Sequence, residues 1–222
     1  MQRPGRHPMQ IYLETANPDE LREAMAWRVV DGVFTDPALL AREGKESTAL
    51  IRELVELVPG PVAVEVTSFG TEEIVEEARL LSSLHDRILV RVPCVPAGIP
   101  AIAALADERI AVDASLCFSV PQALLAAKAG ASLISPQVSE MDDAGGDGLS
   151  LVSSIMTMLD QFDLKSGVIA GAVRSVGQVA ELARMGADGV ALSLGLLREL
   201  AEHPLSESVR RERLDHWRQA QN

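Results

Sequence analysis

Short runs rich in β-branched and apolar residues alternate with longer amphipathic stretches, and this alternation limits the possible folds more than any other feature of the chain. Alternating strand and helix patterns are typical of a parallel sheet covered by helices. Eight such units in 222 residues predict an α/β fold, a (β/α)8 barrel that forms a single domain over residues 10–203. The expected strands are Gln10–Glu14, Asp31–Thr35, Pro61–Val66, Arg87–Val92, Arg109–Asp113, Ser132–Pro136, Gly167–Gly171 and Gly189–Ser193.

The expected helices carry signals at their ends. Asn17, just before a proline, predicts an N-cap, and Thr71 is expected to open the helix after the third strand. Gly130 and Gly186 each follow a helical stretch, where a left-handed glycine turns the chain back toward the sheet. The rival architecture, a doubly wound open sheet, usually has a glycine-rich phosphate turn after its first strand. Here that segment reads ETANPDE, so the barrel is favoured.

The charge balance argues against a polyanion partner. The chain has 20 Lys and Arg against 32 Asp and Glu, a formal net charge of −12, whereas nucleic-acid binding depends on basic side chains that neutralise phosphates. No apolar run reaches the length of a membrane span. Two cysteines, Cys94 and Cys117, are too few for a disulfide framework. We expect a cytoplasmic protein with a short flexible extension over residues 1–9, a small-molecule substrate, and no nucleic-acid or membrane partner.

Several charged residues fall inside or just after the predicted strands. Strand side chains alternate, so one parity packs against the helices and the other points into the barrel. This parity places Glu65, Arg91 and Asp113 inside, while Glu14 ends the first strand and Asp36 follows the second. Barrel enzymes build their active sites at these C-terminal strand ends. A charged side chain that is buried must be paired with an opposite charge or serve a function. The five side chains are therefore predicted to form one functional cluster.

Several motifs in the right order resemble the transaldolase and fructose-6-phosphate aldolase family, from Ile11 to Trp217. The segments that carry the resemblance are IYLETAN, GVFTDPALL, ILVRVP, SLCFSVPQALLAAKAGASLISP and HPLSESVRRERLDHW. The resemblance implies a (β/α)8 barrel and reversible aldol chemistry on ketose phosphates through a lysine imine. It also implies a homo-oligomer, a pentamer or decamer, in which a C-terminal helix over residues 204–222 packs on the barrel or on a neighbouring subunit.

One position departs from the family pattern in a way that changes the chemistry. Arg91 stands where the family keeps its imine-forming lysine. A guanidinium stays protonated and has no free lone pair to attack a carbonyl carbon. Lys45 and Lys128 are expected on helices, and Lys165 in a loop at the far end of the barrel, so none of them replaces that lysine. Imine chemistry at this position is therefore excluded.

The resemblance assigns roles to the residues around Arg91. With Arg91, the predicted catalytic residues are Glu14, Asp36, Glu65 and Asp113. The residues expected to bind substrate are Thr35, Ser115, Ser135, Gln137 and Arg174. Glu140 stands where the family has an arginine that grips phosphate, and Ala172 where it has a serine. These departures argue against a dianionic sugar phosphate as the substrate.

Three functional hypotheses follow. In the first, Arg91 holds a carboxylate or enolate oxygen of a small polar compound, and Glu65 or Asp36 is the general acid/base. In the second, the chain is an inactive homologue kept as a binding or assembly subunit. The third, a metal-dependent site on the carboxylates, ranks last because no histidine joins the cluster. We therefore predict neither a metal nor another cofactor.

Overall fold

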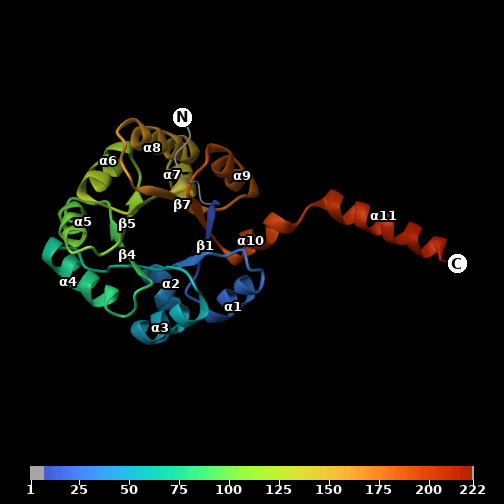
Figure 1. The fold of residues 1–222 in the computed structure, drawn as a ribbon, viewed down its shortest axis with the longest axis horizontal. Coiled ribbons are helices and arrows are strands. Elements are labelled where there is room, and N and C mark those ends of the chain that lie inside the picture. Colours follow the sequence, from blue (N-terminus) through green and yellow to red (C-terminus); the bar gives the residue numbers. More distant parts are fainter. Residues whose placement is uncertain (1–7, 222) are drawn as a thin grey trace.

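Eight parallel strands close into a barrel, and each strand pairs with its neighbours in sequence order (Figure 1). This computed structural model describes residues 8–221, so residues 1–7 of the predicted N-terminal extension lie outside the described residues. The predicted (β/α)8 fold is confirmed, because the last strand pairs with the first and closes the sheet. The strands are β1 Gln10–Glu14, β2 Gly32–Phe34, β3 Val62–Glu65, β4 Ile88–Pro93, β5 Val112–Cys117, β6 Leu133–Pro136, β7 Gly167–Val173 and β8 Gly189–Leu192.

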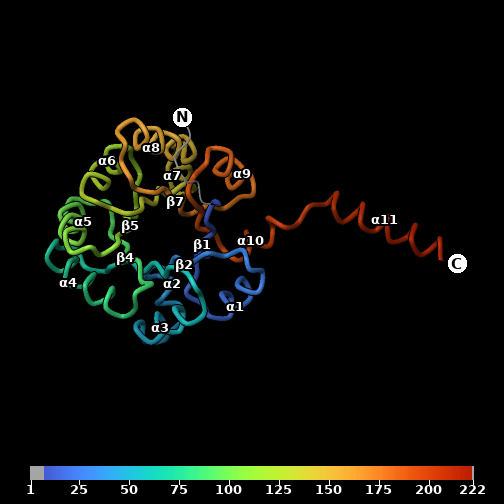
Figure 2. The backbone as a smooth tube through the Cα atoms, in the orientation of Figure 1, coloured from blue at the N-terminus to red at the C-terminus, as the bar shows by residue number. Residues whose placement is uncertain are grey.

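The helices surround the barrel, and the backbone trace in Figure 2 shows them between successive strands. Within residues 8–221, none combines the length and the apolar character that crossing a membrane requires. The helices are α1 Pro18–Ala26, α2 Pro37–Arg42, α3 Ser47–Leu57, α4 Thr71–Ser82, α5 Gly98–Asp107, α6 Val120–Ala129, α7 Val138–Asp143, α8 Gly148–Gln161, α9 Val176–Met185, α10 Leu194–Ala201 and α11 Pro204–Ala220.

The predicted helix ends are largely confirmed. The Asn17 side chain accepts two backbone N–H groups in the first turn of α1. Gly130 (φ 98°) and Gly186 (φ 80°) are left-handed and end α6 and α9, a conformation that glycine adopts without steric cost. Thr71 is the first residue of α4, as expected, and the preceding glycine is the N-cap. The Thr71 hydroxyl donates to the Ala97 carbonyl at 2.9 Å.

The side-chain alternation in the strands separates two packing layers. The larger layer lies between the sheet and the helices. The smaller layer fills the barrel itself and consists of Tyr12, Phe34, Ala63, Leu89, Ile169 and Ala191. Glu65 and Arg91 lie two positions beyond Ala63 and Leu89, so they share the inner face. The apolar barrel core therefore forms a floor beneath the charged C-terminal strand ends.

The fifth strand differs from its prediction. It begins at Val112 rather than Arg109 and continues to Cys117. Arg109 has a φ of 61° and belongs to the turn after α5. The strand passes through a shift in register between Ala114 and Cys117, where Leu116 has a φ of 50°. This β-bulge carries the strand beyond its predicted end at Asp113, through Ser115 and Leu116 to Cys117.

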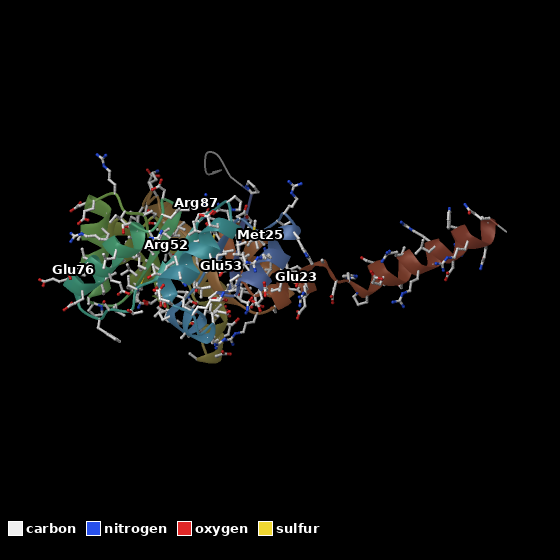
Figure 3. All side chains as sticks on the ribbon, turned by 90° about the horizontal axis from the view of Figure 1, so that it is seen from below. Glu23, Met25, Arg52, Glu53, Glu76 and Arg87 are labelled. Atoms are coloured by element: carbon white, nitrogen blue, oxygen red, sulfur yellow. The ribbon has the colours of Figure 1, made fainter. Side chains whose placement is uncertain are left out.

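The last helix leaves the barrel. Figures 1 and 3 show α11 extending to one side of the molecule, away from the other helices. None of its residues is buried. Leu205 is 67% exposed and Trp217 is 58% exposed. The predicted C-terminal helix is therefore present, and its apolar side chains are uncovered in the single chain.

Candidate active site

Three of the predicted catalytic residues lie side by side on adjacent strands. Glu65 pairs in register with Arg91, and Arg91 pairs in register with Asp113. Glu14 is the last residue of β1, and Asp36 lies two residues after the end of β2. All five therefore lie at the same end of the barrel, the end where parallel-strand barrels carry their active sites.

Arg91 and Asp113 form an ion pair inside this end of the barrel. The Arg91 Nε donates to Asp113 Oδ2 at 3.0 Å, and Nη1 donates to the Thr35 carbonyl at 3.3 Å. Arg91 is 5% exposed and Asp113 is 0% exposed. The Arg91 Cζ also lies 4.6 Å from the centroid of the Phe34 ring, a cation–π contact. The guanidinium is thus held by β2 and β5 and by the aromatic floor.

Two residues that are expected to bind substrate, Ser135 and Gln137, support this pair. The Ser135 hydroxyl donates to Asp113 Oδ1 at 2.7 Å, so both carboxylate oxygens of Asp113 have donors. The Gln137 Nε2 in turn donates to the Ser135 carbonyl at 3.1 Å. A carboxylate held at both oxygens is oriented firmly. In this structure Ser135 therefore positions Asp113, and through it Arg91.

The neighbouring glutamates have perturbed acidities. Burial raises the pKa of Glu14, and the negative charges of Asp36 and Glu140 add to this, while Arg91 opposes it. Burial likewise raises the pKa of Glu65, and the charge of Arg91 and the nearby Ser115 hydroxyl partly offset this rise because both lower it. A carboxyl whose pKa lies closer to neutrality can both take and give a proton under working conditions. Such groups beside a charge partner are typical of active sites.

Asp36 and Thr35 have roles in the local structure of their loop. Asp36 is the N-cap of α2, and its Oδ1 accepts the Leu39 N–H at 2.8 Å. The Thr35 carbonyl accepts a hydrogen bond from Arg91, while the Thr35 hydroxyl is buried and makes no hydrogen bond within residues 8–221. The Ser115 hydroxyl, on the inner face of β5, is also buried and lies near the Glu65 carboxylate. Of the residues expected to bind substrate, Ser115 is thus a neighbour of the predicted acid/base Glu65.

A cavity opens above the charged cluster, and we call it the mouth cavity. It has a volume of about 680 Å³ and is lined by residues that include Glu14, Asp36, Glu140, Arg174 and Ser193. Arg174 is exposed at its rim and forms an ion pair with Asp143 of α7. The basic side chain expected to bind substrate is therefore already partly neutralised by a neighbour.

The lysines of the chain all lie on the surface. Lys45 is in the loop between α2 and α3 rather than on a helix, because α2 ends at Arg42. Lys128 is on α6 and Lys165 precedes β7, as predicted, and all three side chains are exposed. The Nζ of Lys45 pairs with Glu53. Among residues 8–221, no three His, Cys, Asp or Glu side chains come together as metal ligands.

Three acids and one aromatic ring at the site come from residues that were not among the predicted site residues. Glu20 of α1 and Glu199 of α10 line the mouth cavity. Asp143 of α7 forms an ion pair with Arg174, and the Phe34 ring lies against the Arg91 guanidinium. The inward parity of Phe34, one residue before Thr35, was the one signal that could have identified it. The three acids had no such signal in the sequence, because they come near the site only when the helices pack around the barrel.

The family model described as Transaldolase/Fructose-6-phosphate aldolase matches residues 11–222 of the chain. The chain belongs to the transaldolase/fructose-6-phosphate aldolase family. A "Probable transaldolase" from Kosmotoga olearia is 41% identical over 209 residues, which cover 94% of this chain and 96% of the relative. A "Probable transaldolase" from Desulforudis audaxviator is also 41% identical, over 94% of this chain and 97% of the relative.

A solved structure supports the fold of this transaldolase-family chain and nothing further. An inosine 5'-monophosphate dehydrogenase from Legionella pneumophila aligns with a TM-score of 0.57 and 17% sequence identity, covering 83% of this chain and 58% of that one. At that identity the likeness shows a shared barrel architecture, which hosts many unrelated reactions. The function must therefore be argued from the site itself.

Proposed function

We propose that this transaldolase-family chain acts in cytoplasmic carbohydrate metabolism on a small polar carbonyl or hydroxy compound, by acid/base chemistry that forms no imine. The observation that carries this proposal is Arg91, a buried, ion-paired guanidinium on β4. The resemblance to the family expects a lysine at this position. A guanidinium cannot attack a carbonyl carbon, and the lysines of the chain are all exposed on the surface.

Arg91 has the donor needed to stabilise a developing negative charge. Its Nε and Nη1 are used by Asp113 and Thr35, and in the part of the chain that the structure describes its Nη2 makes no hydrogen bond. A fixed N–H donor aimed at an enolate oxygen lowers the barrier to proton abstraction beside a carbonyl, because it is already oriented when the charge forms. In this mechanism the substrate's carbonyl oxygen takes up the electron pair as an enolate, and Arg91 stabilises its negative charge in place of an iminium.

Glu65 is the better candidate for the general acid/base. It lies beside Arg91 in register, and its pKa is raised by burial. Asp36 has one oxygen engaged in the α2 cap, so proton transfer there would compete with a structural contact. Glu65 would remove the proton next to the substrate carbonyl and later return it.

The charge pattern favours an unphosphorylated substrate. Glu140 lines the mouth cavity where the family resemblance expects an arginine. Arg174, one of the two arginines that line the cavity, is paired with Asp143. A phosphate dianion would be repelled by the Glu140 carboxylate and would compete with Asp143 for Arg174, and both effects weaken binding.

Hydrogen exchange at carbon tests this function. The chain is incubated in D2O with dihydroxyacetone, fructose or fructose 6-phosphate, and NMR follows the loss of C–H signals next to the carbonyl. We expect exchange above the buffer rate with an unphosphorylated compound, and a decrease of about 100-fold or more in Glu65→Gln, since a positioned acid/base contributes on this scale.

Glu53→Gln is the matched control, because Glu53 is a partly exposed surface carboxylate on α3 (Figure 3). It should leave the exchange rate unchanged. Exchange at the buffer rate for every compound would contradict the proposed function. That result would favour the alternative, an inactive homologue in which the Arg91 and Asp113 pair only fills the space of a catalytic group.

The exposed helix α11 supports a proposal about assembly. A helix of 17 residues that buries none of them has little to stabilise it in water. Its apolar side chains, among them Leu205, Val209, Leu214 and Trp217, are all exposed. We propose, in line with the family resemblance, that α11 packs on a neighbouring subunit of a pentamer or decamer.

Light scattering tests the assembly. We expect the full chain to have five or ten times the mass of the 23.8 kDa monomer. Deletion of the residues after Pro204 should lower this ratio while the barrel keeps its circular dichroism spectrum. A monomer mass for the full chain, or an unchanged ratio after the deletion, would contradict the proposal.

A further inference from the structure

The two cysteines of the chain lie side by side at the active-site end of the barrel. Cys94 directly follows β4, and Cys117 is the last residue of β5, the neighbouring strand (Figure 1). The Cys94 N–H donates to the Ser115 carbonyl at 2.8 Å, which continues the pairing of the two strands past Pro93. Both thiols are free, and both are buried in the layer between the sheet and the helices. The closed barrel therefore brings together two thiols that are far apart in the sequence.

The two thiols form a short hydrogen-bonded chain that ends at the start of a helix. The Cys94 thiol is hydrogen-bonded to Cys117. The Cys117 thiol donates to the carbonyl of Ser119 at 3.5 Å, and Ser119 is the N-cap of α6. The hydrogen bond with Cys94 lowers the pKa of the Cys117 thiol, and burial opposes this effect. The same hydrogen bond and burial raise the pKa of Cys94. Cys117 is therefore the thiol that more readily becomes a thiolate, which is the nucleophile in thiol oxidation.

Gln122 of α6 holds the two segments together. Its Nε2 donates to the Cys94 carbonyl at 2.8 Å, and its Oε1 accepts the Phe118 N–H at 3.0 Å. One side chain thus connects the loop after β4 to the residue that follows Cys117. The two sulfur atoms must approach to about 2.05 Å to form a disulfide. Because the two backbones are already fixed beside each other, small local shifts are sufficient for that approach.

The end of β5 that carries Cys117 is strained and lies close to the surface. Leu116 has a φ of 50°, and the register of the strand shifts between Ala114 and Cys117. A non-glycine residue in this conformation has a cost in energy that the surrounding structure must offset. Leu116 and Phe118 are both exposed, so the covered thiol lies between two surface residues. Local opening of this bulge would expose Cys117 to a solute as small as hydrogen peroxide while the barrel stays folded.

We propose that Cys94 and Cys117 form a reversible disulfide when the chain is oxidised by hydrogen peroxide, and that this bond tethers the bulged end of β5 to the loop after β4. Two cysteines are too few for a stabilising framework, and in reducing compartments a disulfide is usually transient and redox-sensing. The inference goes beyond the proposed function and does not depend on it, since it concerns thiol chemistry and not the substrate.

The oxidation proceeds in two balanced steps. The Cys117 thiolate attacks one oxygen of the peroxide, the O–O bond breaks, and the departing hydroxide takes up the thiol proton to give water. The Cys94 thiol then attacks the resulting sulfenic sulfur, so that an S–S bond forms, the S–O bond breaks and a second water leaves. Two thiols and one peroxide thus give one disulfide and two waters. Two molecules of a monothiol such as glutathione reverse the change by thiol–disulfide exchange.

Mass spectrometry of the full-length chain tests the chemistry. After treatment with peroxide, we expect a loss of about 2 Da per chain, the mass of the two hydrogens removed. Alkylation of the denatured chain should then label neither cysteine, and digestion without reductant should give a cross-linked peptide that contains Cys94 and Cys117. Glutathione should restore the original mass and both alkylation sites.

A pair of variants assigns the roles of the two thiols. Cys94→Ser keeps the size of the side chain and removes the thiol that closes the disulfide, so a sulfenic acid should accumulate on Cys117 and react with dimedone. Cys117→Ser is the matched control, because it also removes one thiol. Its remaining Cys94 should be labelled about tenfold less, since a thiol with a raised pKa forms little thiolate. Thermal melts establish that both variants are folded.

Backbone amide hydrogen exchange tests the tether. Residues 112–119 should exchange more slowly in the oxidised chain than in the reduced one, because the disulfide suppresses opening of the bulge. The matched segment is the end of β7 at residues 170–173, which also has a shift in register and a non-glycine residue at positive φ but no cysteine. It should exchange equally in both states.

Three results would overturn the disulfide. These are a bond between two chains, oxidation of Cys117 to a sulfinic acid while Cys94 stays free, and retention of both thiols in the folded chain at peroxide concentrations that join them in the urea-unfolded chain. Equal exchange of residues 112–119 in the two redox states would overturn the tether. None of these measurements uses a substrate, so their failure leaves the proposed function untouched.

Discussion

Arg91→Ala should destabilise the chain by about 3–5 kcal/mol at neutral pH, the cost typical of a buried charge that loses its partner. Asp113 is fully buried and its Oδ2 bonds to Arg91, so the substitution leaves this carboxylate with the Ser135 hydroxyl alone. Glu14 and Glu65 lose the cation that lowers their pKa values. Several acids then repel one another in a confined space.

The loss should depend on pH in a definite direction. Burial already raises the pKa of Glu14 and of Glu65 in the folded chain, and removal of Arg91 raises both further. Between the ordinary unfolded value of about 4.3 and these raised folded values, the folded state holds more protons than the unfolded state. Its stability therefore falls as pH rises through this window. The deficit of the variant should be larger at pH 8 than at pH 5.

Thermal or denaturant melts of both proteins at pH 5 and pH 8 measure this difference. Arg198→Ala is the control, because Arg198 forms a two-point ion pair with Glu23 on the exposed surface. Its loss should be about 0–1 kcal/mol and nearly the same at both pH values. Adding Asp113→Asn to Arg91→Ala should recover part of the stability at pH 8. Equal deficits of Arg91→Ala at both pH values would show that these residues are not one electrostatic unit.

The barrel and its inward charges could be predicted from the sequence because both depend on short-range periodicity. Alternation along PVAVEV and ILVRVP assigns Glu65 and Arg91 to one face, and the strand register then places them side by side. The fifth strand was harder to delimit. Its apolar run begins before the strand does, and a bulge with Leu116 in a left-handed conformation extends the strand to Cys117.

The contacts that define the site depend on packing between distant elements, and these had no signal in the sequence. The Ser135 hydroxyl donates to Asp113 across neighbouring strands, a contact that the sequence does not predict. Arg174 is likewise held by Asp143, which comes from a different βα unit. The residue types predict acid/base chemistry in the pocket. The geometry of the closed barrel determines which donor forms a hydrogen bond or ion pair with each acid.

Borohydride reduction should leave the wild-type chain unmodified after incubation with dihydroxyacetone or fructose 6-phosphate, because trapping requires an iminium. Arg91→Lys is the informative comparison, since it restores an amine at the centre of the site. That variant should still lack sugar-phosphate aldol activity. Asp36, Asp113, Gln137 and Glu140 also differ from the residues that the family resemblance expects, and residues of one site act as a unit.

The mass of the wild-type chain after this reduction tests the central claim most directly, since the claim is that no amine of this protein attacks the substrate carbonyl. Intact-mass spectrometry should give the same mass with and without the sugar, at sugar concentrations where deuterium exchange is observed. A mass gain equal to one reduced sugar, mapped by peptide analysis to a residue of the barrel, would contradict the account, because it would show an imine at a site where the chain has only Arg91.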